Sequence, residues 1–127
     1  MSTQASIELK DLLITTQIGR YAQGDVIPDQ HQLDLTLWVD SRFVLIEEDN
    51  MKHVFDYDPL IKDIDRLARD GHYETQERLI TRIVHACATY TPIKSLEISL
   101  RKYPVLNQSG SLGVRLIIDT HTLNQMR

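Results

Sequence analysis

The chain has 127 residues, of which 42% are hydrophobic and 25% are charged, so it is long enough to bury a core and is not disordered throughout. Its formal net charge of −4 gives no overall attraction to nucleic acid or to an anionic membrane. No apolar run approaches the roughly 20 residues of a membrane span, and Met1-Ser2-Thr3-Gln4 lacks the features of a signal peptide. We therefore expect a cytosolic protein with one domain, 1–127, ordered from about 7 to 119.

The first 40 residues predict two long strands. Between Ile7 and Ile18 the apolar positions change from odd to even numbers, which indicates a β-bulge near Lys10-Asp11. A second strand follows from about Leu33 to Val39, where apolar and polar residues alternate. A polar loop of about ten residues begins at Gly19 and joins the two strands, and it is longer than common hairpin loops.

The middle of the chain predicts two helices. The segment 41–55 is compatible with either a short helix or a strand. Asp58-Pro59 is typical of an N-cap and a first helical position, and apolar residues then recur at helical spacing as far as Asp70-Gly71. A second helix is predicted from about Thr75 to Tyr90.

Two further strands, Ser95–Lys102 and Val114–Asp119, complete the order ββααββ. This order predicts an α+β fold, in which an antiparallel four-stranded sheet carries two helices on one face. The other face is expected to be polar, as sampled by Asp34, Thr36 and Asp40. A four-stranded sheet has two unpaired edges, and self-association is an economical way to cover them. We therefore expect a ring-like homo-oligomer.

The second helix begins with two polar residues beside its apolar stripe. Gln76 lies near the centre of the stripe and Glu77 lies on its flank. Glu77 has no basic residue at helical spacing, so its carboxylate is free to bind a ligand with two adjacent N–H donors. The alternative is that Glu77 only stabilises the positive end of its helix.

Lys102 shares the parity of three apolar residues, Leu96, Ile98 and Leu100. If burial lowers its pKa, its amine is suited to acid–base chemistry; the alternative is a lysine that extends its ammonium to water. Tyr57 precedes the first helix and is either an aromatic anchor or a phenol that orients or protonates a ligand.

Other kinds of site are not indicated. The five histidines show no metal-ligand spacing, and no phosphate-binding glycine loop or nucleophile elbow is present. Cys87 lies on the apolar stripe and is interpreted as a small buried hydrophobe. We expect neither a metal nor a cofactor.

Taken together, the motifs resemble those of the dihydroneopterin aldolase family over about Ile7 to Ile118. The motifs that carry the resemblance are, in sequence order, Ile18-Gly19, Asp34, Asp49, Tyr57, Gln76-Glu77-Arg78-Leu79, Lys102 with Pro104, and Gly113-Val114.

The resemblance implies the tunnel fold, with rings of four subunits that stack into an octamer and sites between neighbouring subunits. It implies that Glu77 holds the amino group and ring N–H of a pterin, while backbone next to Gln76 meets the carbonyl. Lys102 is implied as the acid–base residue, and Tyr57 of an adjoining subunit assists proton transfer. The implied reaction cleaves 7,8-dihydroneopterin into 6-hydroxymethyl-7,8-dihydropterin and glycolaldehyde in folate biosynthesis, without a metal or a lysine Schiff base.

Two positions depart from the family pattern. Gly24, followed by Asp25, stands where the family usually has a glutamate that contacts the hydroxylated tail of the ligand, and Gln76 stands where an apolar residue is usual. Two alternative functions therefore stay open: an epimerase of dihydroneopterin triphosphate, or a pterin-binding paralogue without catalysis. For the epimerase, Arg20 and Arg101 are the candidate basic residues near the tail.

Overall fold

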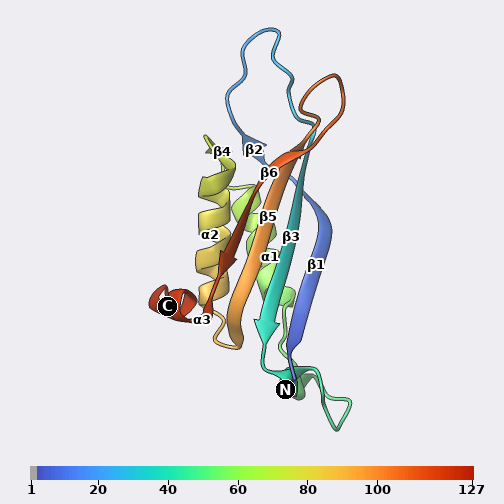
Figure 1. The fold of residues 1–127 in the computed structure, drawn as a ribbon, viewed down its shortest axis with the longest axis vertical. Helices are drawn as coiled ribbons and strands as arrows, with labels where there is room; N and C mark the ends of the chain where they lie inside the picture. The colour runs from blue at the N-terminus through green and yellow to red at the C-terminus, as the bar shows by residue number, and fades with distance from the viewer. Residues whose placement is uncertain (1–2) are drawn as a thin grey trace.

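A computed structural model describes residues 3–127. Its main sheet is antiparallel with the strand order β1-β3-β5-β6, and α1 and α2 cover one face (Figure 1). The α+β class and the order of the six long elements are therefore confirmed. The bounds are β1 Ala5–Ile14, β2 Gln17–Ile18, β3 Gln30–Val39, α1 Asp58–Ala68, β4 His72–Tyr73, α2 Gln76–Ala88, β5 Ile93–Tyr103, β6 Leu112–Ile118 and α3 Thr120–Gln125.

Strand pairing places the apolar residues of the central strands on the face that the helices cover. In β3 and β5, Leu33 lies opposite Leu100 and Leu35 lies opposite Ile98, and these four residues are almost completely buried. The predicted bulge in β1 is confirmed, because the β1–β3 register shifts between Leu9 and Leu12. The apolar residues that alternate along β3 and β5 therefore form the core between the sheet and the helices.

Strand β6 approaches β5 closely at Gly113. A Cβ atom on Gly113 would lie 2.1 Å from the carbonyl oxygen of Leu100 and 2.8 Å from the Cα atom of Arg101. No larger residue fits without separating the two strands. Gly113 is thus a packing requirement at the edge of the sheet.

Both helices form as amphipathic elements, although α1 begins differently from the prediction. The predicted N-cap, Asp58, is the first residue of α1, and Tyr57 occupies the cap position without donating or accepting a capping hydrogen bond through its phenol. The Asp56 carboxylate accepts a hydrogen bond from the Asp58 amide at 3.1 Å, so an aspartate two residues earlier satisfies that N–H. The second helix was predicted to run from about Thr75 to Tyr90; in the structure Thr75 is the N-cap of α2, and its hydroxyl accepts from the Arg78 amide. No helix within residues 3–127 is long and apolar enough to cross a bilayer.

The predicted first strand is wrong in one respect, because it does not continue to Ile18. It ends at Ile14, and after Thr15 and Thr16 the chain forms β2, which pairs in parallel with β4 in a separate two-stranded sheet. Ile18 is buried and packs in the core that the helices cover. Ile18 thus reaches the core because the chain leaves the edge of the main sheet after Ile14. The alternation of apolar positions in the sequence does not reveal this change of sheet.

Two further segments have no counterpart among the predicted elements. The ambiguous segment 41–55 contains two short 3-10 turns, Ser41–Phe43 and Met51–His53. After β6 the chain forms α3, where the Asp119 carboxylate accepts a hydrogen bond from the Thr122 amide at 2.8 Å. Leu123 of α3 is fully buried, so this helix extends the core beyond residue 119.

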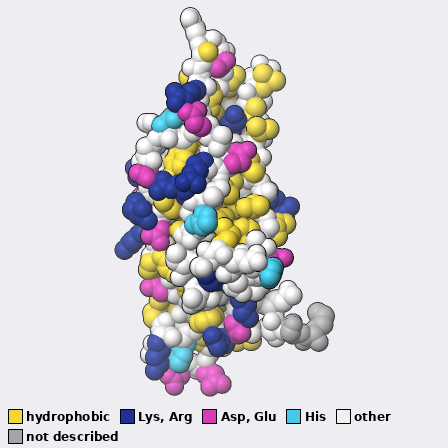
Figure 2. Space-filling model, turned by 90° about the vertical axis from the view of Figure 1, so that its left-hand side faces the viewer, with side chains coloured by type: hydrophobic (Ala, Val, Ile, Leu, Met, Phe, Trp, Pro, Cys, Tyr) yellow, Lys and Arg dark blue, Asp and Glu magenta, His cyan; other side chains and the backbone are white. Residues whose placement is uncertain are grey.

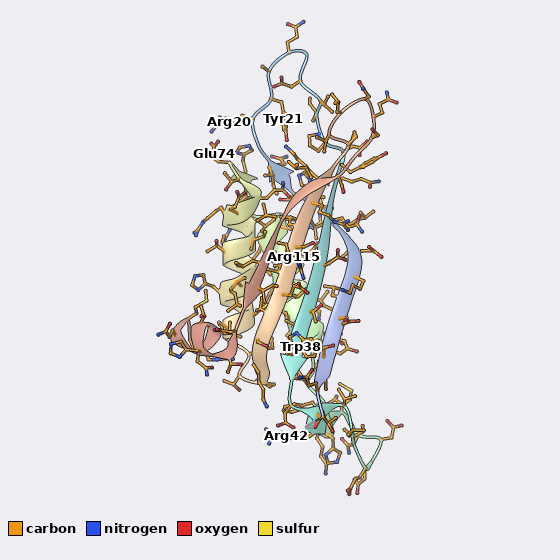
Figure 3. All side chains as sticks on the ribbon, in the orientation of Figure 1. Arg20, Tyr21, Trp38, Arg42, Glu74 and Arg115 are labelled. Carbon is orange, nitrogen blue, oxygen red and sulfur yellow. The ribbon has the colours of Figure 1, made fainter. Side chains whose placement is uncertain are left out.

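The face of the sheet that the helices leave open is polar and charged. Arg101 binds Asp34 at 3.1 Å, and Arg115, which projects from the front of the sheet in Figure 3, pairs with Glu97. A shallow cavity of about 140 Å³ lies over this face. The polar face expected from Asp34 and Thr36 is confirmed, and its acidic residues Asp34 and Glu97 have basic partners. Asp40, the third residue of that prediction, lies beyond the end of β3 and caps the turn Ser41–Phe43.

Candidate functional site

The beginning of α2, the end of β5 and the beginning of β3 lie at the same end of the molecule (Figure 1). The loops 19–29 and 104–111 project from this end as well. It therefore carries three of the four predicted site residues: Gln76 and Glu77 in the first turn of α2, and Lys102 next to the last residue of β5.

Lys102 lies half-buried on the face of the sheet that the helices cover. Its parity with the buried residues of β5 is confirmed by the β3–β5 register. Within residues 3–127 it forms no salt bridge with any acidic residue. A half-buried ammonium without a counter-ion remains available to donate hydrogen bonds to a bound ligand.

Gln76 and Glu77 differ in burial although they are neighbours. Gln76 is 9% exposed, and its amide oxygen Oε1 has no hydrogen-bond partner. Glu77 is exposed in the single chain and forms no salt bridge with a described residue. The start of the helix also offers backbone N–H groups without intrahelical partners. An acceptor-only carboxylate beside free N–H groups suits a ligand edge that carries both N–H donors and a carbonyl.

Tyr57 lies at the opposite end of the helical layer. It precedes α1, whereas Glu77 begins α2, and the two helices run in opposite directions (Figure 1). Because α1 has 11 residues, Tyr57 is separated from the start of α2 by about 16 Å along the helix axis. Tyr57 is exposed and borders an apolar cavity of about 180 Å³ between α1 and the strands β1 and β3. A single subunit does not bring Tyr57 together with Glu77 and Lys102.

Several contacts fix the beginning of the loop 19–29 to residues 72–74, which precede α2. The Gly19 amide donates to the Tyr73 carbonyl at 2.8 Å, and His72 Nε2 contacts the Gly19 carbonyl at 2.6 Å. Arg20 binds both carboxylate oxygens of Glu74 through its Nε, at 2.8 and 3.0 Å, and Figure 3 shows the two residues side by side. This pairing raises the pKa of Arg20 and lowers the pKa of Glu74. The contacts connect the loop to the segment immediately before Gln76.

The tip of this loop contains Gly24, which departs from the pattern expected at this position, and Asp25. Gly24 has a φ of +90°, a conformation that favours glycine. The Asp25 carboxylate accepts a hydrogen bond from the Ala22 amide at 2.7 Å, and the Asp25 amide donates to the Ala22 carbonyl at 3.1 Å. Asp25 therefore closes its own turn and would have to break that bond to contact a ligand.

The remaining reactive groups are not arranged as a second centre. Within residues 3–127, no group of three or more His, Cys, Asp or Glu residues is placed to bind a metal. Cys87 is fully buried, and burial raises the pKa of its thiol to about 12. Its interpretation as a buried hydrophobe is confirmed.

One residue of this end was not singled out by the sequence pattern. His31 lies directly opposite Lys102 in the β3–β5 pairing and is buried. The spacing of the histidines in the sequence does not reveal His31, because its relevance depends on pairing across strands. Its parity with Leu33 and Leu35 was the available signal, since it predicts the same face of the sheet.

Comparison with known proteins identifies the family. The family model for dihydroneopterin aldolase matches residues 7–117. A dihydroneopterin aldolase from Burkholderia thailendensis bound to guanine has a TM-score of 0.77 and 19% identity, and the match covers 91% of each protein. A putative dihydroneopterin aldolase from Vibrio cholerae has a TM-score of 0.77 and 21% identity, covering 93% of this protein and 99% of that one.

The Escherichia coli dihydroneopterin aldolase in complex with neopterin has a TM-score of 0.74 and 16% identity, covering 89% of this protein and 97% of that one. At these identities the structures show a common fold, the tunnel fold expected from the sequence. Among curated protein sequences no significant match is found. Because the family model spans nearly the whole sequence, the protein belongs to the dihydroneopterin aldolase family.

Proposed function

We propose that this protein is a dihydroneopterin aldolase, which cleaves 7,8-dihydroneopterin into 6-hydroxymethyl-7,8-dihydropterin and glycolaldehyde in the cytoplasm, as a step of folate biosynthesis. The observation that carries the proposal is the position of Lys102. It is half-buried without an acidic partner among the described residues, at the same end of the fold as the free carboxylate of Glu77. A base and an anchor for a nitrogen heterocycle are the two groups that this cleavage requires.

The anchor is proposed to act through charge-assisted hydrogen bonds. Glu77 accepts from the amino group and the adjacent ring N–H of the pterin, while backbone N–H next to Gln76 donates to the ring carbonyl. The E. coli relative is in complex with neopterin and the Burkholderia relative is bound to guanine. Both ligands are flat heterocycles with an amino group, a ring N–H and a carbonyl along one edge, which supports this role for Glu77.

The chemistry is proposed to follow from the ligand's own ring. The C=N bond of a dihydropterin accepts the electron pair that is released when the carbon–carbon bond of the hydroxylated tail breaks, so the reaction as proposed uses neither a metal nor a Schiff base. The protein takes the proton from the 2′-hydroxyl and returns a proton to the enamine carbon. Lys102 is the proposed acid–base residue, with Tyr57 assisting.

The site is proposed to be complete only between subunits. Tyr57 lies at the far end of the helical layer from Glu77, so a second copy has to supply it. Strands β1 and β6 are the edges of the sheet, and they expose apolar residues such as Leu13 at 58% and Ile117 at 65%. Pairing of these edges would close rings of four, which stack into an octamer, and light scattering of the purified protein measures the resulting mass.

The triphosphate epimerase has less support as a function. Its substrate requires several free basic groups near the tail. Arg20 is already bound to Glu74, and Arg101 is bound to Asp34 on the other face of the sheet. On the face of the molecule in Figure 2, basic and acidic residues are interspersed without a large basic patch.

A product assay tests the proposal. The purified protein is incubated with 7,8-dihydroneopterin and, separately, with its triphosphate, and the products are separated by chromatography. We expect glycolaldehyde and 6-hydroxymethyl-7,8-dihydropterin from the first substrate, and a much slower release of both products with Lys102→Ala. An epimer as the sole product would contradict the proposal in favour of the epimerase. Pterin binding without any product would contradict it in favour of a binding protein.

A further inference from the structure

His31 is a buried histidine directly beside the proposed acid–base residue. It is 7% exposed and lies opposite Lys102 across β3 and β5, so both residues project from the same face of the sheet. Its Nε2 atom is buried and has no hydrogen-bond partner. Buried polar atoms without partners are uncommon and need an explanation.

The surroundings of His31 favour the neutral imidazole. Burial lowers the pKa of His31, and the positive charge of Lys102 lowers it further. On the other side, β1 places Ile14 opposite His31, and Leu33 is the next residue of β3 on the same face. Lys102 is the one charged group among the described residues that shifts the pKa of His31. A neutral imidazole has one nitrogen that accepts a hydrogen bond.

We propose that His31 is a positioning residue for Lys102, and that its neutral imidazole accepts a hydrogen bond from the lysine ammonium and directs the amine toward the ligand. The proposal rests on the proposed function, because it assigns a role within the same site. An unpartnered acceptor and an ammonium without a counter-ion lie on neighbouring strands. A hydrogen bond between the two side chains would satisfy both groups.

A histidine suits this role better than an acidic residue would. A carboxylate beside Lys102 would form an ion pair and raise the pKa of the amine, which would hold the lysine in its charged form. A neutral acceptor orients the ammonium without adding a counter-ion beside it. An apolar residue would leave the lysine without any fixed direction.

The first test measures the contact without ligand or turnover. NMR titration of the His31 ring compares the wild type with Lys102→Met, and with Lys94→Met as a matched control at the other end of β5. We expect the His31 pKa to lie below the usual value for histidine and to rise in Lys102→Met, because the positive charge that disfavours the protonated imidazole is removed. A His31 pKa that is unchanged in Lys102→Met would overturn the proposal.

The second test separates positioning from structural support. His31→Phe keeps a ring of similar size but removes the acceptor, whereas His31→Gln restores an acceptor and His85→Gln is an exposed control. We expect kcat to fall about tenfold in His31→Phe and to return within about threefold of wild type in His31→Gln, with pterin affinity unchanged in both. Equal loss of kcat in both variants, or none in His31→Phe, would overturn the proposal.

The two tests also distinguish this proposal from the proposed function. If the protein releases no glycolaldehyde, the aldolase assignment fails, yet the NMR titration still reports whether His31 and Lys102 interact. If turnover is observed but His31→Phe has wild-type kcat, only the positioning role fails. Thermal unfolding of each variant verifies that the compared proteins are folded.

Discussion

Two regions of the molecule differ in whether the fold supplies partners for the charged residues that matter most to the proposed site. On the open face of the sheet, Asp34 pairs with Arg101 and Glu97 pairs with Arg115. At the end that carries the start of α2, Arg20 pairs with Glu74, but Glu77 and Lys102 have no salt-bridge partner among the described residues. Paired charges are satisfied by the fold alone, whereas unpaired charges near buried surface are available to a ligand. The contrast locates the proposed site more clearly than the size of any cavity does.

The largest effect is expected from removing the unpaired ammonium. Lys102→Ala should lower kcat by about 10²- to 10⁴-fold, the usual range for loss of a general acid–base group, while the dissociation constant for neopterin changes little. Steady-state kinetics and equilibrium binding measure the two quantities, with Lys94→Ala as the control. If Lys102→Ala weakened binding as much as turnover, Lys102 would be an anchor and not an acid–base residue.

The unpaired carboxylate is expected to affect binding more than chemistry. Glu77→Gln keeps the shape of the residue but loses the charge, so the dissociation constant for neopterin should rise by about 10- to 100-fold, as expected for loss of hydrogen bonds to a charged group. Isothermal titration calorimetry measures the change, and Glu47→Gln on an exposed turn is the matched control. Unchanged affinity for neopterin in Glu77→Gln would show that the Glu77 carboxylate does not anchor the ligand.

Breaking an ion pair on the open face of the sheet should have little effect on stability or on kcat. The side chains of Arg115 and Glu97 are partly exposed, at 66% and 30%, so Arg115→Met should change the free energy of unfolding by no more than about 1 kcal/mol. The wild-type contribution should also weaken with added salt. Urea unfolding at low and high salt measures both effects. A large loss of kcat in Arg115→Met, without loss of stability, would show that the comparison of the two regions is wrong.

A paired group far from the site predicts a pH effect on stability alone. The Tyr90 hydroxyl donates to Asp63 at 2.6 Å, and this hydrogen bond to the carboxylate, with burial, raises the pKa of Tyr90 to about 12. The folded state therefore holds the phenol proton more tightly than the unfolded state, where the pKa is about 10. Stability from this group is fully present below about pH 10 and is lost between about pH 10 and 12. In a profile of the free energy of unfolding against pH, Tyr90→Phe should therefore show a smaller decrease between about pH 10 and 12 than the wild type. The same decrease in both proteins would contradict this prediction.

Much of the fold follows from local patterns in the sequence. The alternation in β3 predicted its buried face, and the change of parity in β1 predicted the bulge that the structure has between Leu9 and Leu12. The interruption before β2 was not predictable, because β2 is defined by pairing with β4, which lies far along the sequence. The helix α3 was also missed, since its single fully buried residue, Leu123, gives no periodic signal.

The candidate site was predictable only in part for a similar reason. Lys102 and Gln76 were recognisable because charged or polar residues interrupted apolar patterns, and the structure places both where those patterns predicted. His31 interrupts the pattern of β3 in the same way, but its meaning depends on the register that brings it opposite Lys102. Sequence patterns predict faces of elements, whereas cross-strand neighbours require the pairing itself.

The central claim is that Glu77 and Lys102 of one subunit act together with Tyr57 of another, and subunit complementation tests it most directly. Lys102→Ala and Tyr57→Ala are each purified, then mixed in equal amounts, unfolded and refolded together. If the site is shared between subunits, about one quarter of the sites in random mixtures regain all their residues, so activity should rise to about a quarter of wild type. Activity no higher than the mean of the two separate variants would contradict the account.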